Sequence, residues 1–171
     1  MILVDAGPLV ALVDASDEHH VRCVAALKGV AEPMGTVWPA VAEALYLLQD
    51  VPDGQQAVLE MLRRRVVRLM PLAEEDVTRL QELMAKYVGL PMELADAALV
   101  RVAERDGLDR VFTLDRRDFG VYRIEGRKAF RIIPDAPARR RGPTPRRRPR
   151  SRRTGRLKVP PGVRGGATAR R

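Results

Sequence analysis

Short apolar runs recur along the chain, each bounded by turn-forming residues and separated from the next by a segment of helical spacing. These runs lie at residues 2–4, 35–38, 66–69, 111–114 and 129–133. Strands that alternate with helices are typically joined in parallel, because each crossover helix returns the chain to the same edge of the sheet. The pattern therefore predicts an α/β fold with a central parallel sheet, helices on both faces, and ligands beyond the carboxyl ends of the strands.

The segments between these runs have the spacing of helices. The expected helices span residues 9–13, 17–28, 39–49, 55–65, 73–88 and 92–106. The segment 39–49 is apolar almost all round, which is typical of a buried helix. The segment 17–28 is expected to bury one apolar side, which comprises Val21, Val24, Ala25 and Leu27.

Charge divides the chain into two unlike parts. The 171 residues carry 31 Lys and Arg against 22 Asp and Glu, a formal net charge of +9. Residues 1–134 hold 17 basic and 21 acidic side chains, whereas residues 135–171 hold 14 basic side chains and one acidic. The second part has too few apolar residues to offset the entropy of ordering. We therefore predict one domain over residues 1–134, followed by a disordered Arg/Pro/Gly-rich basic tail over residues 135–171.

Cysteine content and hydropathy indicate a cytoplasmic protein. The single cysteine, Cys23, cannot form an intramolecular disulfide and suits a reducing compartment. No run approaches the roughly 18 apolar residues of a membrane helix. The N-terminal residues lack the basic segment that begins a signal peptide. We expect a cytoplasmic location and no membrane partner.

Four carboxylates occupy positions where a folded chain rarely places charge. Asp5 and Asp115 directly follow apolar strands, so both are expected at the carboxyl edge of the sheet. Glu43 is the only charged residue in the segment 39–48, and Asp96 has Leu, Val and Ala on its helical face. An ionised group against apolar surface is costly unless it is paired or binds a metal.

Each of these acids also has a purely structural interpretation. Asp5 and Asp115 could cap the helix or turn that follows a strand. Asp96 could be favoured by the positive end of a helix dipole, worth under about 1 kcal/mol, and Glu43 could be hydrogen-bonded to interior backbone. The coincidence of four such acids, rather than any one of them, favours a shared site.

A cluster of four carboxylates would attract a hard cation. Two carboxylates about 4 Å apart repel each other by roughly 4 kcal/mol at an effective dielectric of 20. Such a cluster either raises its pKa values or binds a cation, and oxygen ligands select Mg²⁺ or Mn²⁺. A bound ion of this kind can activate water and neutralise phosphate oxygens, so the chemistry favoured is metal-assisted phosphodiester hydrolysis.

The segments around these acids resemble, in order and spacing, the successive motifs of PIN-domain ribonucleases. They are residues 2–12 (ILVDAGPLVAL), the isolated Glu43, residues 93–99 (ELADAAL) and residues 112–119 (FTLDRRDF). Within that family the chain is most similar to the VapC-type toxins of bacterial and archaeal toxin–antitoxin pairs. The resemblance covers about residues 1–134, and the four motifs together are specific although each alone is weak.

This resemblance implies a Rossmann-like, three-layer α/β/α fold and a pocket that binds Mg²⁺ or Mn²⁺ and cuts RNA. The catalytic set that it implies is Asp5, Glu43, Asp96 and Asp115. Of these, the residues expected to hold the metal are Asp5, Asp96 and Asp115. Ala6 stands where the family often has Ser or Thr, so a hydroxyl role at that position is absent.

Three neighbours of the last acid are expected to bind substrate, and a further acid lies close by. Thr113 matches a hydroxyl position that is common in the family, and Asp118 matches a less constant fifth acid. Arg116 and Arg117 are candidates for contacting substrate phosphates, although a solvated pair of charges is the commoner case. The family also implies a homodimer and a small antitoxin protein that covers the active-site cleft.

Other classes of protein fit the sequence less well. A phosphatase of the haloacid-dehalogenase type would need a second Asp two residues after Asp5, where the chain has Gly7. A receiver domain would need a phospho-acceptor Asp after a central strand and a Lys after a late one, and neither is in place. The remaining alternative is a non-catalytic RNA- or protein-binding module with structural acids and a basic binding tail.

The basic residues of the tail could contact RNA phosphates with a steep dependence on salt. However, residues 135–171 contain no aromatic side chain on which a base could stack. This composition favours a non-functional extension.

Overall fold

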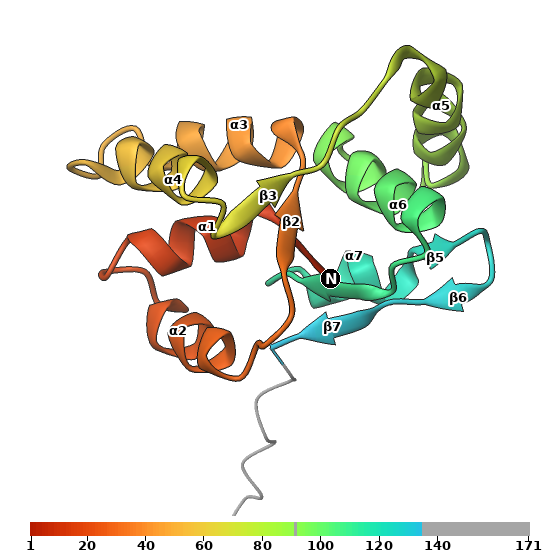
Figure 1. The fold of residues 1–171 in the computed structure, drawn as a ribbon. Helices are drawn as coiled ribbons and strands as arrows, with labels where there is room; N and C mark the ends of the chain where they lie inside the picture. Colours follow the sequence, from red (N-terminus) through yellow and green to blue (C-terminus); the bar gives the residue numbers. More distant parts are fainter. Residues whose placement is uncertain (91, 135–171) are drawn as a thin grey trace, which may run out of the picture. The chain divides into compact units, whose positions relative to one another are not determined.

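The computed structural model describes residues 1–90 and 92–134. Its five-stranded sheet consists of β1 (Ile2–Val4), β2 (Met34–Thr36), β3 (Val67–Leu69), β4 (Arg110–Phe112) and β7 (Arg131–Ile133). The order is β3-β2-β1-β4-β7 and every pairing is parallel. Helices lie on both sides of this sheet (Figure 1). The predicted three-layer α/β architecture is confirmed, whereas the predicted tail lies outside the described residues.

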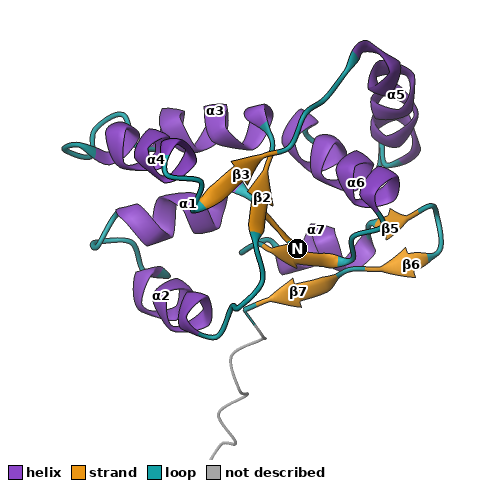
Figure 2. Ribbon diagram, in the orientation of Figure 1, coloured by secondary structure: helices purple, strands orange, loops and turns teal. Residues whose placement is uncertain are grey.

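Seven α-helices of the described residues surround the sheet (Figure 2). They are α1 (Ala6–Val13), α2 (His20–Lys28), α3 (Trp38–Leu47), α4 (Gly54–Arg63), α5 (Val77–Lys86), α6 (Leu94–Asp106) and α7 (Arg116–Val121). A 3₁₀ turn, η1 (Glu74–Asp76), precedes α5, and β5 (Arg123–Ile124) forms a small antiparallel pair with β6 (Lys128–Ala129). Within the part of the chain that the structure describes, no helix is both long and apolar enough to cross a bilayer.

The central strand β1 is buried along its whole length. Its residue Leu3 is paired with Gly35 of β2 on one side and with Val111 of β4 on the other. All three residues of β1 are completely inaccessible to solvent, as expected for a parallel strand covered by helices on both faces. Asp5 follows directly, and its backbone N–H donates to the carbonyl of Phe112 at the end of β4 (3.0 Å). The first acid is thereby fixed at the carboxyl edge of the sheet.

Helix α1 begins three residues earlier than predicted. Asp5 is its N-cap, and its carboxylate accepts a hydrogen bond from the N–H of Ala6 (2.8 Å). Pro8 lies in the first turn, where its missing N–H removes no helical hydrogen bond. The Asp-Ala-Gly-Pro sequence, predicted as a turn, is therefore a capped helix start.

The expectation that the whole of α3 is buried is wrong. Its side chains Trp38, Tyr46 and Leu47 are 57%, 69% and 51% exposed, and its buried residues are Ala40, Val41 and Ala44. Only one side of α3 packs against α1, α4 and α6. Hydropathy alone could not distinguish a buried helix from one that leaves large apolar side chains in contact with solvent.

The predicted apolar side of α2 is only partly right, because Leu27 packs against the core but Val21 and Ala25 are exposed. Val21 is 79% exposed, and the buried residue of this helix is Cys23. The helix begins at His20 rather than Asp17 because two acids cap turns before it: Asp14 accepts from the N–H of Ser16 (2.8 Å) and Asp17 from that of His19 (2.7 Å). The face of α2 that packs against the core carries Cys23, Ala26 and Leu27.

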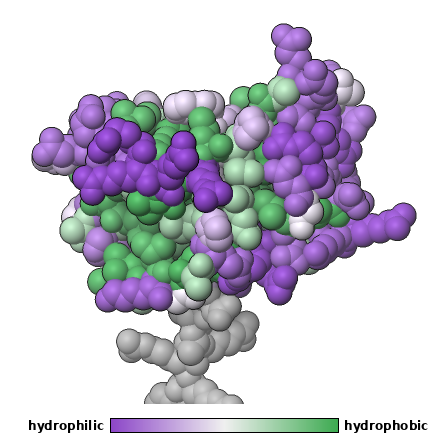
Figure 3. All heavy atoms as spheres, in the orientation of Figure 1, coloured by the Kyte–Doolittle hydropathy of each residue, from purple (hydrophilic) through white to green (hydrophobic). Residues whose placement is uncertain are grey.

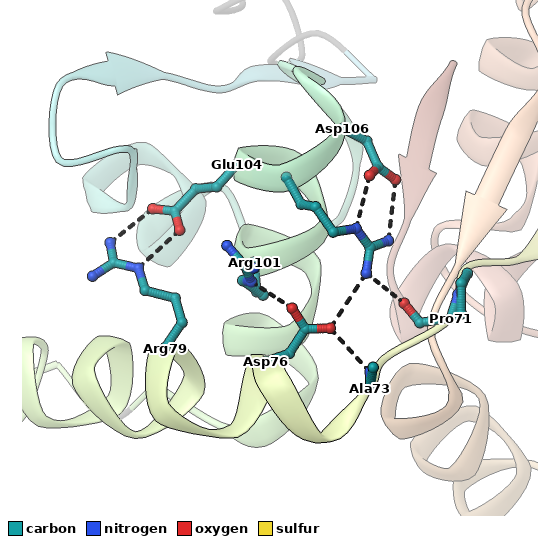
Figure 4. Close-up of polar contacts among 8 residues, drawn as sticks. Pro71, Ala73, Asp76, Arg79, Arg101, Glu104 and Asp106 are labelled. Atoms are coloured by element: carbon teal, nitrogen blue, oxygen red, sulfur yellow. Dashed lines mark hydrogen bonds and ion pairs between the residues drawn. The ribbon is translucent and has the colours of Figure 1, made fainter.

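Ion pairs connect η1 and α5 to α6 (Figure 4). Asp76, which is 2% exposed, accepts from Arg101 Nε (2.7 Å) and Arg105 Nη1 (3.3 Å). One turn further on, Arg79 forms a bidentate pair with Glu104 (2.9 Å to each oxygen). The side of the molecule around α5 is predominantly hydrophilic in Figure 3. These contacts fix the helix whose first turn carries Asp96.

Candidate active site

A pocket of about 280 Å³ lies where β1 and β4 end. Its lining comprises Asp5, Gly7, Glu43, Glu93, Asp96, Leu114, Asp115 and Asp118. Six of these eight residues are acidic and none is basic. The four acids selected from the sequence come from four separate parts of the fold, and the structure brings them together around this one space.

Asp5 is held at both carboxylate oxygens. Its Oδ1 accepts from the N–H of Ala6 (2.8 Å), and its Oδ2 accepts from Oγ1 of Thr113 (2.7 Å). Burial raises the pKa of Asp5 above its ordinary value, the two hydrogen bonds oppose this rise, and the charges of Asp115 and Glu93 add to it. Asp5 is therefore an oriented carboxylate in surroundings that disfavour its charge.

Thr113 occupies a position unlike that expected of a substrate-binding residue. Its side chain is completely buried, and its hydroxyl both donates to Asp5 and accepts from the N–H of Asp115 (3.0 Å). The hydroxyl thus links the end of β1 to the loop that follows β4. The role that this geometry supports is to orient Asp5.

Asp96 and Glu93 stand at the start of α6. The Oδ2 atom of Asp96 accepts from the N–H of Glu93 (3.3 Å) and from the hydroxyl of Tyr122 (3.2 Å). Burial, followed by the negative charge of Asp5, raises the pKa of Asp96 to about 7. Sequence reasoning gave Glu93 and Tyr122 no role. The available signal for Glu93 was its position one helical turn before Asp96.

Glu43 reaches the pocket from α3 and is half-buried. Burial raises its pKa, and the charges of Asp5 and Glu93 raise it further. A carboxylate whose pKa is moved towards neutrality is suited to exchange protons near neutral pH. Of the two interpretations of the isolated Glu43, the structure favours a position in a shared acidic site.

The loop after β4 and the helix α7 supply the remaining charged groups. Asp115 caps α7 by accepting from the N–H of Asp118 (2.9 Å). Oδ1 of Asp118 is shielded from solvent without a hydrogen-bond partner among the described residues, and lies 3.7 Å from Nε of Arg117, whose side chain is 83% exposed. Arg116 instead donates to the carbonyl of Pro134 (2.6 Å). Of the two arginines expected to contact substrate, Arg117 lies beside the pocket, and Arg116 is held at the end of β7.

The donor set of the pocket fits a hard divalent cation. All of its charged groups are carboxylates, burial and neighbouring negative charge raise the pKa values of Asp5 and Asp96, and one oxygen of Asp118 lacks a hydrogen bond. As the side chains stand, no group of three or more His, Cys, Asp or Glu among residues 1–90 and 92–134 could hold a metal ion directly. Mg²⁺ keeps several waters and uses one or two protein carboxylates, so a pocket of this size suits a partly hydrated ion.

The parallel sheet and the acid-lined pocket at its carboxyl edge define the class of protein: an α/β domain whose chemistry-bearing groups are carboxylates. A family model described as PIN domain matches residues 2–125. The chain belongs to the PIN-domain family, and the resemblance inferred from its motifs is confirmed.

Individual proteins agree with this assignment. The chain is 28% identical over 135 residues to Ribonuclease VapC26 of Mycobacterium tuberculosis. The aligned region covers 78% of this chain and 100% of VapC26. The fold is similar to that of VapC20 of Mycobacterium tuberculosis, a sarcin–ricin loop cleaving toxin, with a TM-score of 0.62, 19% identity, and coverage of 70% of this chain and 94% of VapC20. The fold is also similar to that of FitAcB from Neisseria gonorrhoeae, with a TM-score of 0.53 and 22% identity. This match covers 70% of this chain and 91% of the FitAcB chain.

Proposed function

We propose that this protein is a Mg²⁺- or Mn²⁺-dependent endoribonuclease and the toxin of a toxin–antitoxin pair. The observation that carries the proposal is the pocket lined by six acidic residues and no basic one. The similarity to Ribonuclease VapC26 supports RNA as the substrate. A non-catalytic module with structural acids would have no need to gather six carboxylates around one space whose lining holds no basic side chain.

In this proposal Asp5 and Asp96 hold the cation, with Asp115 contributing directly or through water. A cation bound there would lower the pKa of water and neutralise charge on the phosphate oxygens. Thr113 keeps the carboxylate of Asp5 in one orientation through its 2.7 Å hydrogen bond. This hydrogen bond orients the carboxylate before RNA arrives, as hydrogen bonds to metal-binding side chains do at other metal centres.

Glu43 acts as the general base. Its raised pKa lets the carboxylate accept the proton of a water that attacks the phosphorus, and the bond from phosphorus to the 3′ oxygen then breaks. The products are a 3′-hydroxyl end and a 5′-phosphate end. Arg117 is exposed beside Asp118, and we assign its guanidinium group to binding a neighbouring phosphate of the RNA.

The partners proposed are the RNA substrate, a cognate antitoxin protein and a second copy of this chain. Similarity to a VapC toxin supports the antitoxin. The exposed apolar residues Trp38, Tyr46 and Leu47 of α3 support a protein contact, because large apolar side chains gathered on one helix often mark an interface. Light scattering of the purified chain tests the dimer directly.

The decisive experiment compares RNA cleavage by the wild-type protein and by Asp5→Asn in the presence of Mn²⁺. We expect the variant to lose at least about 100-fold in rate, since a positioned charge at the reacting centre contributes on this scale. Glu75→Gln is the matched control, because Glu75 is an exposed acid outside the pocket. Equal rates for wild type and Asp5→Asn would refute the proposed mechanism.

Metal dependence has its own measurement. The melting temperature of the wild-type protein should rise with Mn²⁺ concentration. At a Mn²⁺ concentration of 100 times the dissociation constant, the free energy of unfolding should increase by about 2.7 kcal/mol. Asp5→Asn should respond weakly, and Glu75→Gln should respond as wild type does. A wild-type melting temperature that is indifferent to Mn²⁺ would favour the non-catalytic module.

A further inference from the structure

Tyr122 connects the end of α7 to the first turn of α6. It is completely buried, and its hydroxyl donates to Oδ2 of Asp96 (3.2 Å). Its own backbone N–H is bonded to the carbonyl of Asp118 (3.0 Å). The same short helix therefore carries Asp115 and Asp118 at its start and, at its end, a side-chain donor to Asp96.

Aromatic contacts fix the ring that carries this hydroxyl. The ring of Tyr87 lies 5.0 Å from that of Tyr122 at an interplanar angle of 67°, and the ring of Phe119 lies 5.4 Å away at 74°. Edge-to-face pairs of this kind are favourable and restrict rotation of a buried ring. The ring is thereby held in place with its hydroxyl oxygen 3.2 Å from Oδ2 of Asp96.

Asp96 depends on this contact more than an exposed carboxylate would. The second donor to its Oδ2 atom is the N–H of Glu93, at 3.3 Å. The lining of the pocket offers no basic side chain. A buried carboxylate with few donors can rotate between orientations, and each orientation presents its oxygens differently to a cation.

We propose that Tyr122 is a positioning residue for Asp96, holding its carboxylate in the orientation that binds the divalent cation. The arrangement parallels that of Thr113 and Asp5, in which a buried hydroxyl also donates to a pocket carboxylate. This inference rests on the proposed function, because it requires that the pocket bind a cation. It assigns a role to a residue for which the sequence motifs gave none.

The test separates orientation of Asp96 from simple packing. Tyr122→Phe removes one oxygen and keeps the ring contacts with Tyr87 and Phe119. Tyr87→Phe is the matched control, because Tyr87 belongs to the same aromatic cluster and its hydroxyl accepts from the backbone N–H of Arg123 (3.1 Å) rather than donating to Asp96. The Mn²⁺ dissociation constants of the full-length wild type and both variants are measured by titration calorimetry, and metal-free melting temperatures are recorded in parallel.

We expect Tyr122→Phe to weaken Mn²⁺ binding by about 10- to 100-fold, the usual effect of losing an outer-shell partner of a metal ligand. Tyr87→Phe should lower the melting temperature without changing Mn²⁺ affinity. An unchanged Mn²⁺ affinity in Tyr122→Phe would overturn the positioning role while leaving the proposed function intact. Absence of Mn²⁺ binding by the wild type would overturn both.

Discussion

Asp96 carries a charge that its surroundings oppose. Burial and the nearby charge of Asp5 raise its pKa from the ordinary value of 3.8 to about 7. A carboxyl group with a higher pKa in the folded state than in the unfolded state binds its proton more tightly when folded. The free energy of unfolding therefore falls progressively as the pH rises from 3.8 to about 7. Above about pH 7 the destabilisation caused by the Asp96 charge is complete.

Asp96→Asn should consequently stabilise the metal-free protein while abolishing cation-dependent cleavage. We expect its free energy of unfolding at pH 8 to exceed that of wild type by about 1 to 3 kcal/mol, allowing for the partial exposure of the group. The difference should shrink towards about pH 3, below the ordinary pKa of 3.8, where Asp96 is protonated in most folded and unfolded wild-type chains. Urea unfolding in the presence of a chelator at both pH values measures this. A variant less stable than wild type at pH 8 would contradict the prediction.

Some residues of the site could be predicted from the sequence and others could not. Asp5 and Asp115 were identifiable because each directly follows an apolar strand, and Glu43 and Asp96 because each is a charge on an apolar helical face. A hydroxyl gives no such signal, because its importance depends on the group that it contacts. Thr113 contacts an acid 108 residues away in the sequence, and Tyr122 contacts one 26 residues away.

At the scale of elements, the ion pairs between η1, α5 and α6 hold the helix that carries Asp96 (Figure 4). Hydrogen bonds from the N–H of Ala73 and from Arg101 lower the pKa of Asp76. A carboxyl group with a lowered pKa contributes stability above its ordinary value of 3.8, and this contribution is lost as the pH falls further.

Asp76→Ala should lower the free energy of unfolding by about 2 to 3 kcal/mol at pH 7, since it removes hydrogen bonds to a buried charged group. The difference from wild type should narrow below pH 3.8, where protonation weakens the same contacts in the wild type. Asp106→Ala is the control, because Asp106 pairs with Arg105 from a side chain that is 30% exposed. We expect that change to cost less than about 1 kcal/mol, and urea unfolding compares the three proteins. Equal losses in the two variants would contradict the role given to Asp76.

The helices and their ends matched the sequence predictions where local signals, such as a capping residue, agreed with the tertiary packing. Helix α6 ends at Asp106 as predicted, because Gly107 adopts the left-handed conformation (φ 66°) that closes a helix. Helix α7 was missed because six residues leave little room for a helical pattern, and its start depends on the cap supplied by Asp115. In α3, hydropathy identified the helix but not the side that other helices cover.

At the scale of the whole molecule, the described residues contain a five-stranded parallel sheet in which β7 pairs with β4. We therefore expect a chain shortened to residues 1–134 to fold, with a melting temperature and a response to Mn²⁺ close to those of the full-length protein. Calorimetry of the two chains, with and without Mn²⁺, measures both. A fall of more than about 4 °C on truncation, equivalent to roughly 1 kcal/mol or more, would show that residues 135–171 contribute to the stability of the domain.

The sequence by itself determined the alternation of strands and helices, and it identified four acids that follow apolar strands or lie on apolar helical faces. Periodicity and charge isolation are local properties, so they can be read without knowing the fold. Only the tertiary structure decided that Glu93 and Asp118 join those acids around one pocket, that Tyr122 and Thr113 donate to Asp96 and Asp5, and that Arg116 is held at Pro134. Those contacts arise because the parallel sheet brings the carboxyl ends of strands from distant parts of the chain to a single edge.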